Sequence, residues 1–246
     1  MEGVIRLLPY AIADGATNMA ADEVMVRGAA ESGIASLRFY GWAEATVSLG
    51  YFQAADARLA DAHLTALPFV RRSSGGATLV HHHELTYALA LPPVPTWHSA
   101  EPWMARMHRI VIAALASLGV TQNLALSGEA TVRHGDVLCF QQFTPGDLLC
   151  AGRKVVGSAQ RKHHRALMQH GSVLLAQSEY TPTLPGIREL TGVELTMTAM
   201  REAVLREFVR DTEWTVEQAS WDEQERGTIS DLATTKYLSK EWNERR

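Results

Sequence analysis

Cysteine is scarce in this chain: Cys139 and Cys150 are the two cysteines among its 246 residues. That number is too small for a disulfide-stapled secreted domain, and the two residues do not form the CxxC pairs of a structural zinc site. In a reducing compartment neither cysteine is expected to form a permanent disulfide. The reactivity of these two thiols is therefore the first question that the sequence raises.

Strong charge of one sign is also missing, since 23 Lys and Arg residues face 27 Asp and Glu residues for a net charge of −4. This balance argues against a protein that coats nucleic acid or an anionic membrane. No apolar run approaches the roughly 20 residues of a transmembrane helix, and the N-terminus lacks the basic and apolar regions of a secretory signal. We therefore expect a cytoplasmic protein with no nucleic-acid or membrane partner.

The sequence contains no internal repeats, low-complexity blocks or glycine- and proline-rich linkers. Hydrophobic residues make up 46% of the chain and charged residues 20%, which is an ordinary globular mixture. We therefore predict a single catalytic domain over residues 1–246, with a helical C-terminal segment from about residue 192.

Two segments, residues 18–30 and 98–119, have apolar side chains at the spacing of an amphipathic helix. In the second segment Ser99 can cap the start, Pro102 suits the first turn and Gly119 the end. Helices are thus predicted both before and after the first strand-like stretches.

Strand-like stretches follow a different pattern, with β-branched and apolar residues between turn signals. They cover residues 35–42, 45–52, 147–162 and 165–177. Ala151 and Gly152 separate two such runs, which predicts a hairpin turn. On the strand after that turn, alternation predicts Lys154 and Ser158 on one face and Gly157 on the other. Helices before, between and after antiparallel strands indicate an α+β domain.

A glycine segment, RRSSGGATLVHHHELTY, covers residues 71–87. Its adjacent Gly75 and Gly76 allow backbone amides to approach a ligand, and Arg71 and Arg72 offer donors to a phosphate or carbonyl oxygen. A double glycine can equally be a simple turn. The segment has neither the lysine spacing of a P-loop nor the GxGxxG of a dinucleotide fold.

Three consecutive histidines, residues 81–83, suggest a metal site at first sight. Neighbouring residues on a strand point to opposite faces, so the three cannot converge on one ion. His163 and His164 lie beside basic residues, and a solvated turn is their simplest interpretation. We therefore predict no metal site.

Lys154 lies in GRKVVGSAQ, where Gly152, Gly157 and Ser158 are small neighbours. Most lysines are solvated surface residues, and a solvated position on the surface is one interpretation of Lys154. Small neighbours would, however, leave room for a ligand against the strand.

These motifs together resemble the lipoate–protein ligase and octanoyltransferase family, the biotin/lipoate protein ligase catalytic domain, over nearly the whole chain. The matching stretches, in family order, are NMAADEVM, LRFYGWAEATVSLGYFQ, RRSSGGATLVHHHELTY, GRKVVGSAQ, HGSVLL and KYLSKEWN. The resemblance implies a mixed, largely antiparallel sheet flanked by helices, of the kind shared with biotin ligases. It also implies an enzyme that transfers an acyl group to a lysine of a lipoyl domain.

The family contains two chemistries that differ in their cofactors. Ligases use ATP and Mg²⁺ to form lipoyl-adenylate, whereas octanoyltransferases take octanoyl from acyl carrier protein without a cofactor, because a cysteine can attack the thioester directly. Cys139 stands fifteen residues before Lys154, which resembles the cysteine-dependent octanoyltransferase branch. Cys139 is then the expected nucleophile and Lys154 the cation beside it, although an inert buried cysteine is the alternative. Cys150 matches no family motif and is interpreted as packing.

By the same resemblance, part of the glycine segment is expected to bind substrate together with two residues after the lysine. These positions are Arg72, Gly75, Gly76, Ala77, Thr78, Leu79, Val80, His81, Gly157 and Ser158. Ala77 stands where relatives commonly have Gly or Arg, and His82 where they commonly have Asp. The ELTY after the histidines resembles the transferases more than the ligases.

The leading hypothesis is thus an octanoyl-[acyl carrier protein]:protein N-octanoyltransferase. Its expected partners are octanoyl-acyl carrier protein and the lipoyl domains of glycine cleavage H protein or 2-oxoacid dehydrogenases. Since such carrier domains are acidic, Arg153, Arg161 and Lys162 are candidates for attracting them. An ATP-dependent lipoate–protein ligase is the alternative, and the substitutions at Ala77 and His82 leave a non-catalytic acyl- or lipoyl-domain-binding protein open.

Overall fold

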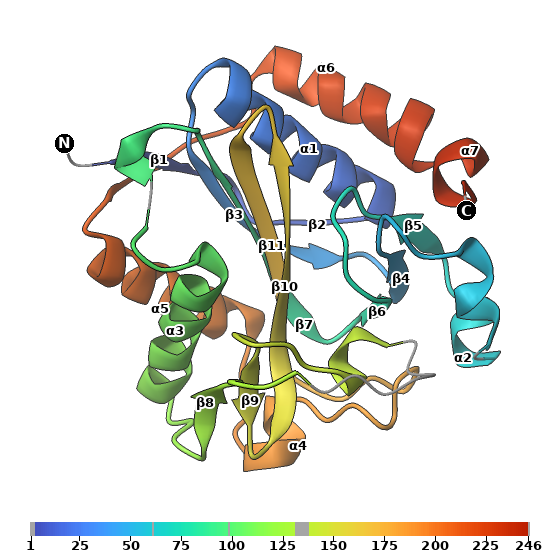
Figure 1. The fold of residues 1–246 in the computed structure, drawn as a ribbon, viewed down its shortest axis with the longest axis vertical. Helices are drawn as coiled ribbons and strands as arrows, with labels where there is room; N and C mark the ends of the chain where they lie inside the picture. Colours follow the sequence, from blue (N-terminus) through green and yellow to red (C-terminus); the bar gives the residue numbers. More distant parts are fainter. Residues whose placement is uncertain (1–2, 61, 98, 131–137, 246) are drawn as a thin grey trace.

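The structure is a computed structural model that describes residues 3–60, 62–97, 99–130 and 138–245. Within these residues the main sheet has the strand order β12-β1-β3-β7-β11-β10-β9-β8, and β2 pairs with β3 (Figure 1). Its strands are β1 (Val4–Leu7), β2 (Ala11–Ala13), β3 (Ser36–Trp42), β7 (Glu84–Leu91), β8 (Leu124–Leu126), β9 (Leu148–Cys150), β10 (Arg153–His163), β11 (Ala166–Leu174) and β12 (Thr215–Gln218). The pairs from β3 through β7, β11, β10 and β9 to β8 are antiparallel, whereas β1 pairs in parallel with both β12 and β3.

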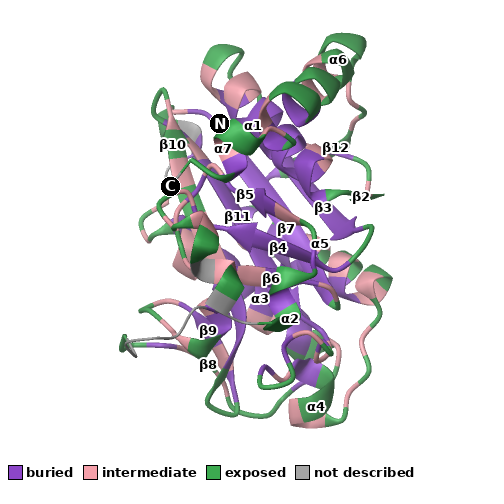
Figure 2. Ribbon diagram, turned by 90° about the vertical axis from the view of Figure 1, so that its right-hand side faces the viewer, coloured by how far each residue is buried: buried purple, intermediate pink, exposed green. Residues whose placement is uncertain are grey.

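Helices cover both faces of this sheet (Figure 1). On one face lie α1 (Gly15–Glu31) and α6 (Glu223–Leu232), and on the other α3 (Trp103–Ser117) and α5 (Met197–Thr212). Each pair of helices packs an apolar core against its side of the sheet, and Figure 2 shows the strands buried between helices whose outer sides are exposed. The other α-helices in the described residues are α2 (Ala62–Thr65), α4 (Ile187–Thr191) and α7 (Lys240–Asn243). The predicted α+β fold, a largely antiparallel sheet flanked by helices, is confirmed.

A smaller sheet, of order β5-β4-β6, lies over one end of the main sheet (Figure 1). It consists of β4 (Thr46–Leu49), β5 (Phe69–Arg71) and β6 (Leu79–His81). The glycine segment leaves this sheet at the end of β5 and returns to it as β6. Its loop is therefore held at both ends against a layer that faces the main sheet.

The two predicted helices are present, but their starts differ from the expectation. α1 begins at Gly15, earlier than predicted, because the Asp14 side chain accepts a hydrogen bond from the Thr17 backbone N–H at 2.8 Å and caps it. α3 begins at Trp103 with Pro102 as its N-cap and no side-chain cap, so the prediction that Ser99 caps this helix is wrong. The Ser99 hydroxyl instead accepts from the Glu101 backbone. His98, the first residue of that predicted helix, lies outside the described residues.

The predicted hairpin is present, with β9 and β10 joined at Ala151 and Gly152. Both turn residues have positive φ, +48° and +75°, as a two-residue hairpin of the primed type requires. The predicted alternation after it is wrong, because the pairing with β9 shifts between Lys154 and Val156. A Cβ on Gly157 would lie 2.6 Å from the Lys154 Cε, whereas the Ser158 hydroxyl contacts His108 of α3. Lys154 and Ser158 therefore occupy opposite faces of the sheet.

The segment beyond residue 192 is mostly helical, but it also contains β12 (Thr215–Gln218), which the sequence pattern did not indicate. β12 pairs in parallel with β1, so strands from near both ends of the chain lie side by side. This pairing supports the proposed single domain.

Candidate functional site

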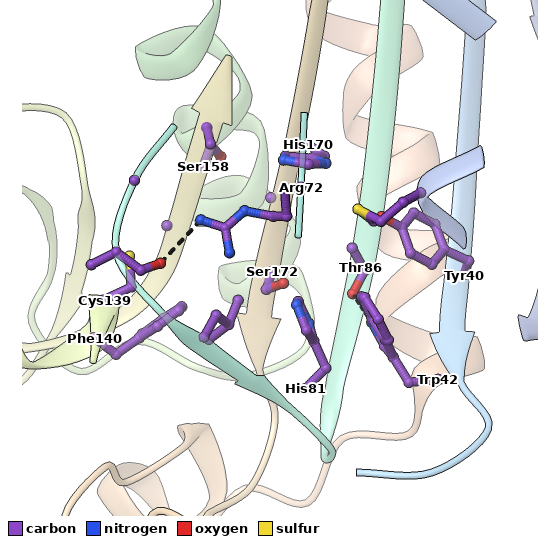
Figure 3. A pocket seen from close by; sticks show the side chains of 17 residues that line it. Tyr40, Trp42, Arg72, His81, Thr86, Cys139, Phe140, Ser158, His170 and Ser172 are labelled. Carbon is purple, nitrogen blue, oxygen red and sulfur yellow. Dashed lines mark hydrogen bonds between the residues drawn. The ribbon is translucent and has the colours of Figure 1, made fainter. Parts of the chain in front are cut away.

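A cavity lies between the main sheet and the small sheet, on the face that α1 covers (Figure 3). It is partly open to solvent. Most of its wall is apolar or aromatic. Its lining residues are Met19, Tyr40, Trp42, Arg72, Gly76, Ala77, Leu79, His81, Thr86, Cys139, Phe140, Gly157, Ser158, Ala159, His170, Gly171 and Ser172.

Cys139 lies at one side of this cavity, where η3 (Cys139–Gln141) forms a single 3-10 turn. The residue is partly exposed, and its backbone N–H donates to the Thr78 carbonyl at 2.7 Å. The Lys154 Nζ lies 3.6 Å from the Cys139 Sγ and 3.5 Å from its carbonyl oxygen. The structure therefore brings together the two residues that the sequence proposed as the catalytic pair.

Lys154 also has a partner that the sequence analysis missed. Its Nζ lies 2.7 Å from Asp147 Oδ2, and both side chains are buried. Asp147 is itself fixed by Thr144, whose backbone N–H donates to the same carboxylate oxygen at 2.8 Å. A buried ammonium group needs a counter-charge. The sequence signal for Asp147 was therefore an acidic residue just before the hairpin that carries Lys154. Cys139, Lys154 and Asp147 thus form a thiol–ammonium–carboxylate row.

The two arginines of the glycine segment have different environments. Arg71 is fully buried and donates to backbone carbonyls, among them Gln53 at 2.6 Å and Asn243 at 2.9 Å. It therefore ties β5 to α7 rather than facing a ligand. Arg72 lines the cavity, but its two terminal nitrogens donate to Ser48, Gly75 and Ala77.

His81 points from β6 into the cavity, and its ring stacks on Trp42 with 3.7 Å between ring centroids (Figure 3). Its Nε2 contacts the Ser48 hydroxyl at 2.7 Å, and its Nδ1 contacts the Glu84 carboxylate. Burial lowers the pKa of His81, which outweighs the opposing effect of Glu84. His81 is therefore held as a neutral ring in the cavity wall. Trp42 and Glu84 carried no role in the sequence analysis, although both lie within stretches that matched the family.

Five predicted substrate-binding positions besides Arg72 and His81 line the cavity. They are Gly76, Ala77, Leu79, Gly157 and Ser158. Gly75, Thr78 and Val80 do not line it. Gly75 lies next to the exposed Phe52 ring, Thr78 is buried under the Cys139 turn, and Val80 packs in the apolar core of the small sheet.

The other sequence candidates lie away from the cavity. Cys150 is fully buried in the main core, as its interpretation as packing predicts, and burial raises the pKa of its thiol. The rings of His82 and His83 stack on each other, and His82 Nδ1 contacts Ser178.

Within the described residues no group of three His, Cys, Asp or Glu side chains could hold a metal ion. None of the helices in the described ranges has the length and apolarity needed to span a bilayer.

The chain is thus an α+β domain with a cavity beside which a thiol and an ammonium group meet. Residues 14–181 match the lipoyl protein ligase A/B catalytic domain, so the chain belongs to that family, as its motifs indicated. It is 29% identical to an octanoyltransferase LipM of Geobacillus kaustophilus, with 99% of each chain covered. It is 30% identical to an octanoyltransferase LipM of Bacillus subtilis, with 98% of each covered. A solved lipoate-protein ligase A bound with ATP has the same fold, with a TM-score of 0.73, 21% identity and 99% of each chain covered.

Proposed function

We propose that this protein is an octanoyltransferase of lipoate biosynthesis, which moves an octanoyl group from acyl carrier protein to a lysine of a lipoyl domain. The observation that carries the proposal is the 3.6 Å contact between the Cys139 thiol and the Lys154 amine at the edge of an apolar cavity. The similarity to octanoyltransferases over almost the full chain supports it.

In the first step the Cys139 sulfur attacks the thioester carbonyl of the octanoyl donor, and the carrier's thiolate leaves. A thiol is a weak nucleophile until it loses its proton, and the Lys154 ammonium beside it stabilises the thiolate. Asp147 holds that ammonium in place from the far side. The apolar wall of the cavity then accommodates the alkyl chain.

In the second step the target lysine amine attacks the acyl group on Cys139 and releases the thiolate again. Energy for the amide bond comes from the thioester, so the reaction needs no nucleotide. The proposed acceptor is a lipoyl domain, either of glycine cleavage H protein or of a 2-oxoacid dehydrogenase. Acidic carrier domains in the cytoplasm are proposed to be attracted by three basic residues, the exposed Arg153 and Lys162 and the half-buried Arg161.

The contacts of Arg72 favour this chemistry over adenylate formation. Its terminal nitrogens donate to the carbonyls of Ser48, Gly75 and Ala77 and to the Ser48 hydroxyl, at 2.7–3.0 Å. A nucleotide phosphate would have to displace these bonds before the guanidinium fork could bind it. A ligase would also require ATP and Mg²⁺, whereas the transferase requires no cofactor.

The test is incubation with octanoyl-acyl carrier protein in the absence of ATP, followed by intact-protein mass spectrometry. We expect one octanoyl mass on Cys139 and its loss when a lipoyl domain is added. No adduct on the wild-type protein, together with full transfer by Cys139→Ser, would reject the proposal. Lipoate-dependent pyrophosphate exchange would instead establish the ATP-dependent ligase.

A further inference from the structure

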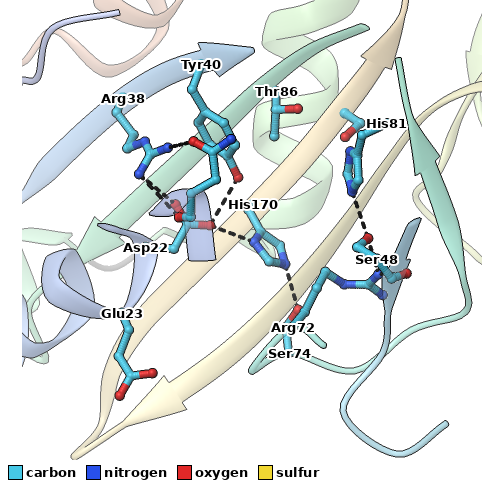
Figure 4. A network of polar contacts seen from close by, with 12 residues as sticks. Asp22, Glu23, Arg38, Tyr40, Ser48, Arg72, Ser74, His81, Thr86 and His170 are labelled. Atoms are coloured by element: carbon cyan, nitrogen blue, oxygen red, sulfur yellow. Dashed lines mark hydrogen bonds and ion pairs between the residues drawn. The ribbon is translucent and has the colours of Figure 1, made fainter. Parts of the chain in front are cut away.

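Two buried histidines make polar contacts on opposite faces of the main sheet. On the α1 face, the His170 ring contacts Asp22 of α1 at 2.9 Å (Figure 4). On the α3 face, the His108 ring contacts the Ser158 hydroxyl through Nε2 at 2.6 Å and the Gly146 carbonyl through Nδ1 at 2.5 Å. His108 therefore joins α3 to β10 and to the segment just before β9.

The carbonyl that His108 contacts belongs to a tight turn, TPGD at residues 144–147. The Asp147 backbone N–H donates to the Thr144 carbonyl at 3.0 Å, and Gly146 has a φ of +94°. Proline followed by a glycine with positive φ is typical of a type II turn. The Gly146 carbonyl is part of the peptide unit that leads into Asp147. A hydrogen bond to that carbonyl therefore fixes the plane from which the Asp147 side chain leaves.

Hydrogen-bonding capacity fixes the protonation of the His108 ring. The Gly146 carbonyl can only accept, so Nδ1 carries a proton. Burial lowers the pKa of His108 and outweighs the opposing effects of the Gly146 carbonyl and Asp147, while Lys154 lowers the pKa further. The ring is therefore neutral, and its Nε2 accepts a hydrogen bond from the Ser158 hydroxyl.

The turn meets the thiol–ammonium–carboxylate row at Asp147. From the cavity side, the Lys154 Nζ lies 2.7 Å from Asp147 Oδ2 and 3.6 Å from the Cys139 Sγ. From the α3 side, His108 holds the carbonyl just before Asp147. Because the ion pair is the shorter of these two contacts of the ammonium, the amine follows the carboxylate when the turn shifts. A displaced turn would therefore draw the amine away from the sulfur.

We propose that His108 is a positioning residue for the acylation of Cys139, an inference that rests on the proposed function. Its ring spans from β10, which carries Lys154, to the turn that carries Asp147. It thereby sets the distance between the ammonium group and its counter-charge, and the counter-charge holds the ammonium beside the sulfur. His108 is not among the residues that line the cavity, so it acts through Asp147.

Two amide substitutions separate the contacts of the two ring nitrogens. In His108→Asn the amide nitrogen takes the position of Nδ1 and can still donate to Gly146. In His108→Gln the longer side chain places its amide near Nε2, at Ser158, and leaves the Gly146 carbonyl without its donor. Tyr87→Phe is the matched control, because it removes a hydroxyl 2.7 Å from Ser158 Oγ and leaves the contact between His108 and Gly146 in place.

The readouts are iodoacetamide labelling of Cys139 at pH 7 and pH 9.5, the rate at which octanoyl-acyl carrier protein adds an octanoyl mass, and urea unfolding. We expect His108→Gln to lower acylation and labelling at pH 7 by about tenfold or more, since a misplacement of about 1 Å can cost up to about 100-fold. At pH 9.5 a cysteine thiol ionises without a neighbouring cation, so labelling should equal that of wild type. His108→Asn and Tyr87→Phe should keep both rates close to wild type, whatever stability they lose.

Equal losses of labelling in His108→Gln and His108→Asn would overturn the proposal. Wild-type labelling of His108→Gln at pH 7, or a loss that persists at pH 9.5, would overturn it as well. Should His108→Gln not fold, Ser158→Ala removes the hydroxyl that holds the ring at Nε2, and its labelling should fall at pH 7 but not at pH 9.5. Absence of an octanoyl adduct on the wild-type enzyme would instead reject the proposed function, whereas the labelling rates test the position of the amine independently.

Discussion

The Lys154 amine lies between the Cys139 sulfur, at 3.6 Å, and an Asp147 carboxylate oxygen, at 2.7 Å. One buried ammonium group therefore faces both the proposed nucleophile and a fixed counter-charge. The carboxylate lets Lys154 remain charged in a buried position, and that charge is what a cysteine thiolate needs beside it. The neighbouring Phe140 ring, 5.3 Å from the amine, completes its apolar surroundings.

Removing this counter-charge should harm both stability and chemistry. Asp147→Asn leaves a buried ammonium without a carboxylate, which typically costs about 3–5 kcal/mol, and we expect acylation of Cys139 to slow by at least about tenfold. Urea unfolding and the rate of adduct formation measure the two effects. Adding Lys154→Met to this variant should restore much of the stability, since no unpaired charge remains, but not the acylation rate. Unchanged stability and acylation in Asp147→Asn would contradict this reading of the ion pair.

A side chain at residue 157 should displace the Lys154 amine, because Lys154 lies over Gly157. A Cβ there would stand 2.6 Å from the Lys154 Cε and 3.0 Å from its Nζ. Gly157→Ala is therefore expected to displace the amine from Cys139 and to lower the acylation rate at least about tenfold. Iodoacetamide labelling of Cys139 at pH 7 should slow in parallel, because the thiolate loses its neighbouring cation.

Gly227 of α6 supplies the matched control for this substitution. A Cβ at Gly227 meets nothing within 4 Å, and Gly227→Ala should raise the free energy of unfolding by roughly 0.5–1 kcal/mol through helix propensity. Its labelling and acylation rates should equal those of wild type. If Cys139 in Gly157→Ala is labelled at the wild-type rate, then the position of the Lys154 amine does not depend on the absence of a side chain at residue 157.

The proposed catalytic pair was accessible from the sequence because of the spacing that resembles the family motifs, but the contacts around the pair were not. Asp147 precedes the hairpin that carries Lys154, and hydrophobic patterning gives no sign that its side chain turns back to the amine. The wrong face assigned to Ser158 has a similar cause, since a bulge adds a residue without altering the apparent alternation. Both depend on local geometry that emerges only when the strands pair.

Long-range partners escaped prediction for a related reason. β12 is a short strand with mostly exposed residues, and its pairing with β1 joins segments that lie about 210 residues apart in the sequence, as in Val4 and Thr215. The hairpin, by contrast, follows from the local turn signal at Ala151 and Gly152, and the bodies of α1 and α3 follow from their apolar spacing, although the starts of both helices were misplaced. Arg71 and Arg72 both offered donors to a ligand in the sequence, and both are buried. Their partners distinguish them, because Arg71 binds Asn243 of α7 whereas Arg72 lines the cavity.

The link between Arg71 and the C-terminal helix α7 should be essential for stability. The Asn243 side-chain oxygen accepts from the Arg71 backbone N–H at 2.7 Å, and the Asn243 carbonyl accepts from its guanidinium at 2.9 Å. Asn243→Ala leaves the buried Arg71 N–H without that acceptor and should cost about 1–3 kcal/mol, measured by urea unfolding. Exposed Glu244→Ala, one residue further on, should change stability by less than about 0.5 kcal/mol. Equal effects of the two variants would contradict the proposed anchoring role.

The ionised Glu23 carboxylate should stabilise the folded protein at neutral pH but not at strongly acidic pH. Burial by itself would raise its pKa, but hydrogen bonds from Lys236 and Tyr237, each at 2.6 Å, outweigh burial and lower the pKa to about 2 from an ordinary 4.5. Because the folded state holds the proton less tightly than the unfolded state, this stabilisation is complete above about pH 4.5 and is lost as the pH falls towards 2. Glu23→Gln should therefore be less stable than wild type at pH 7.

The pH dependence of that difference is the decisive measurement. Urea unfolding from pH 7 down to pH 2.5 should show the gap between Glu23→Gln and wild type shrinking below about pH 4.5, as the wild-type carboxylate begins to be protonated in the unfolded chain. Glu31→Gln, at the exposed end of the same helix, should leave the curve close to wild type throughout. A gap that stays constant down to pH 2.5 would mean that the charge on Glu23 does not hold α1 to the C-terminal segment.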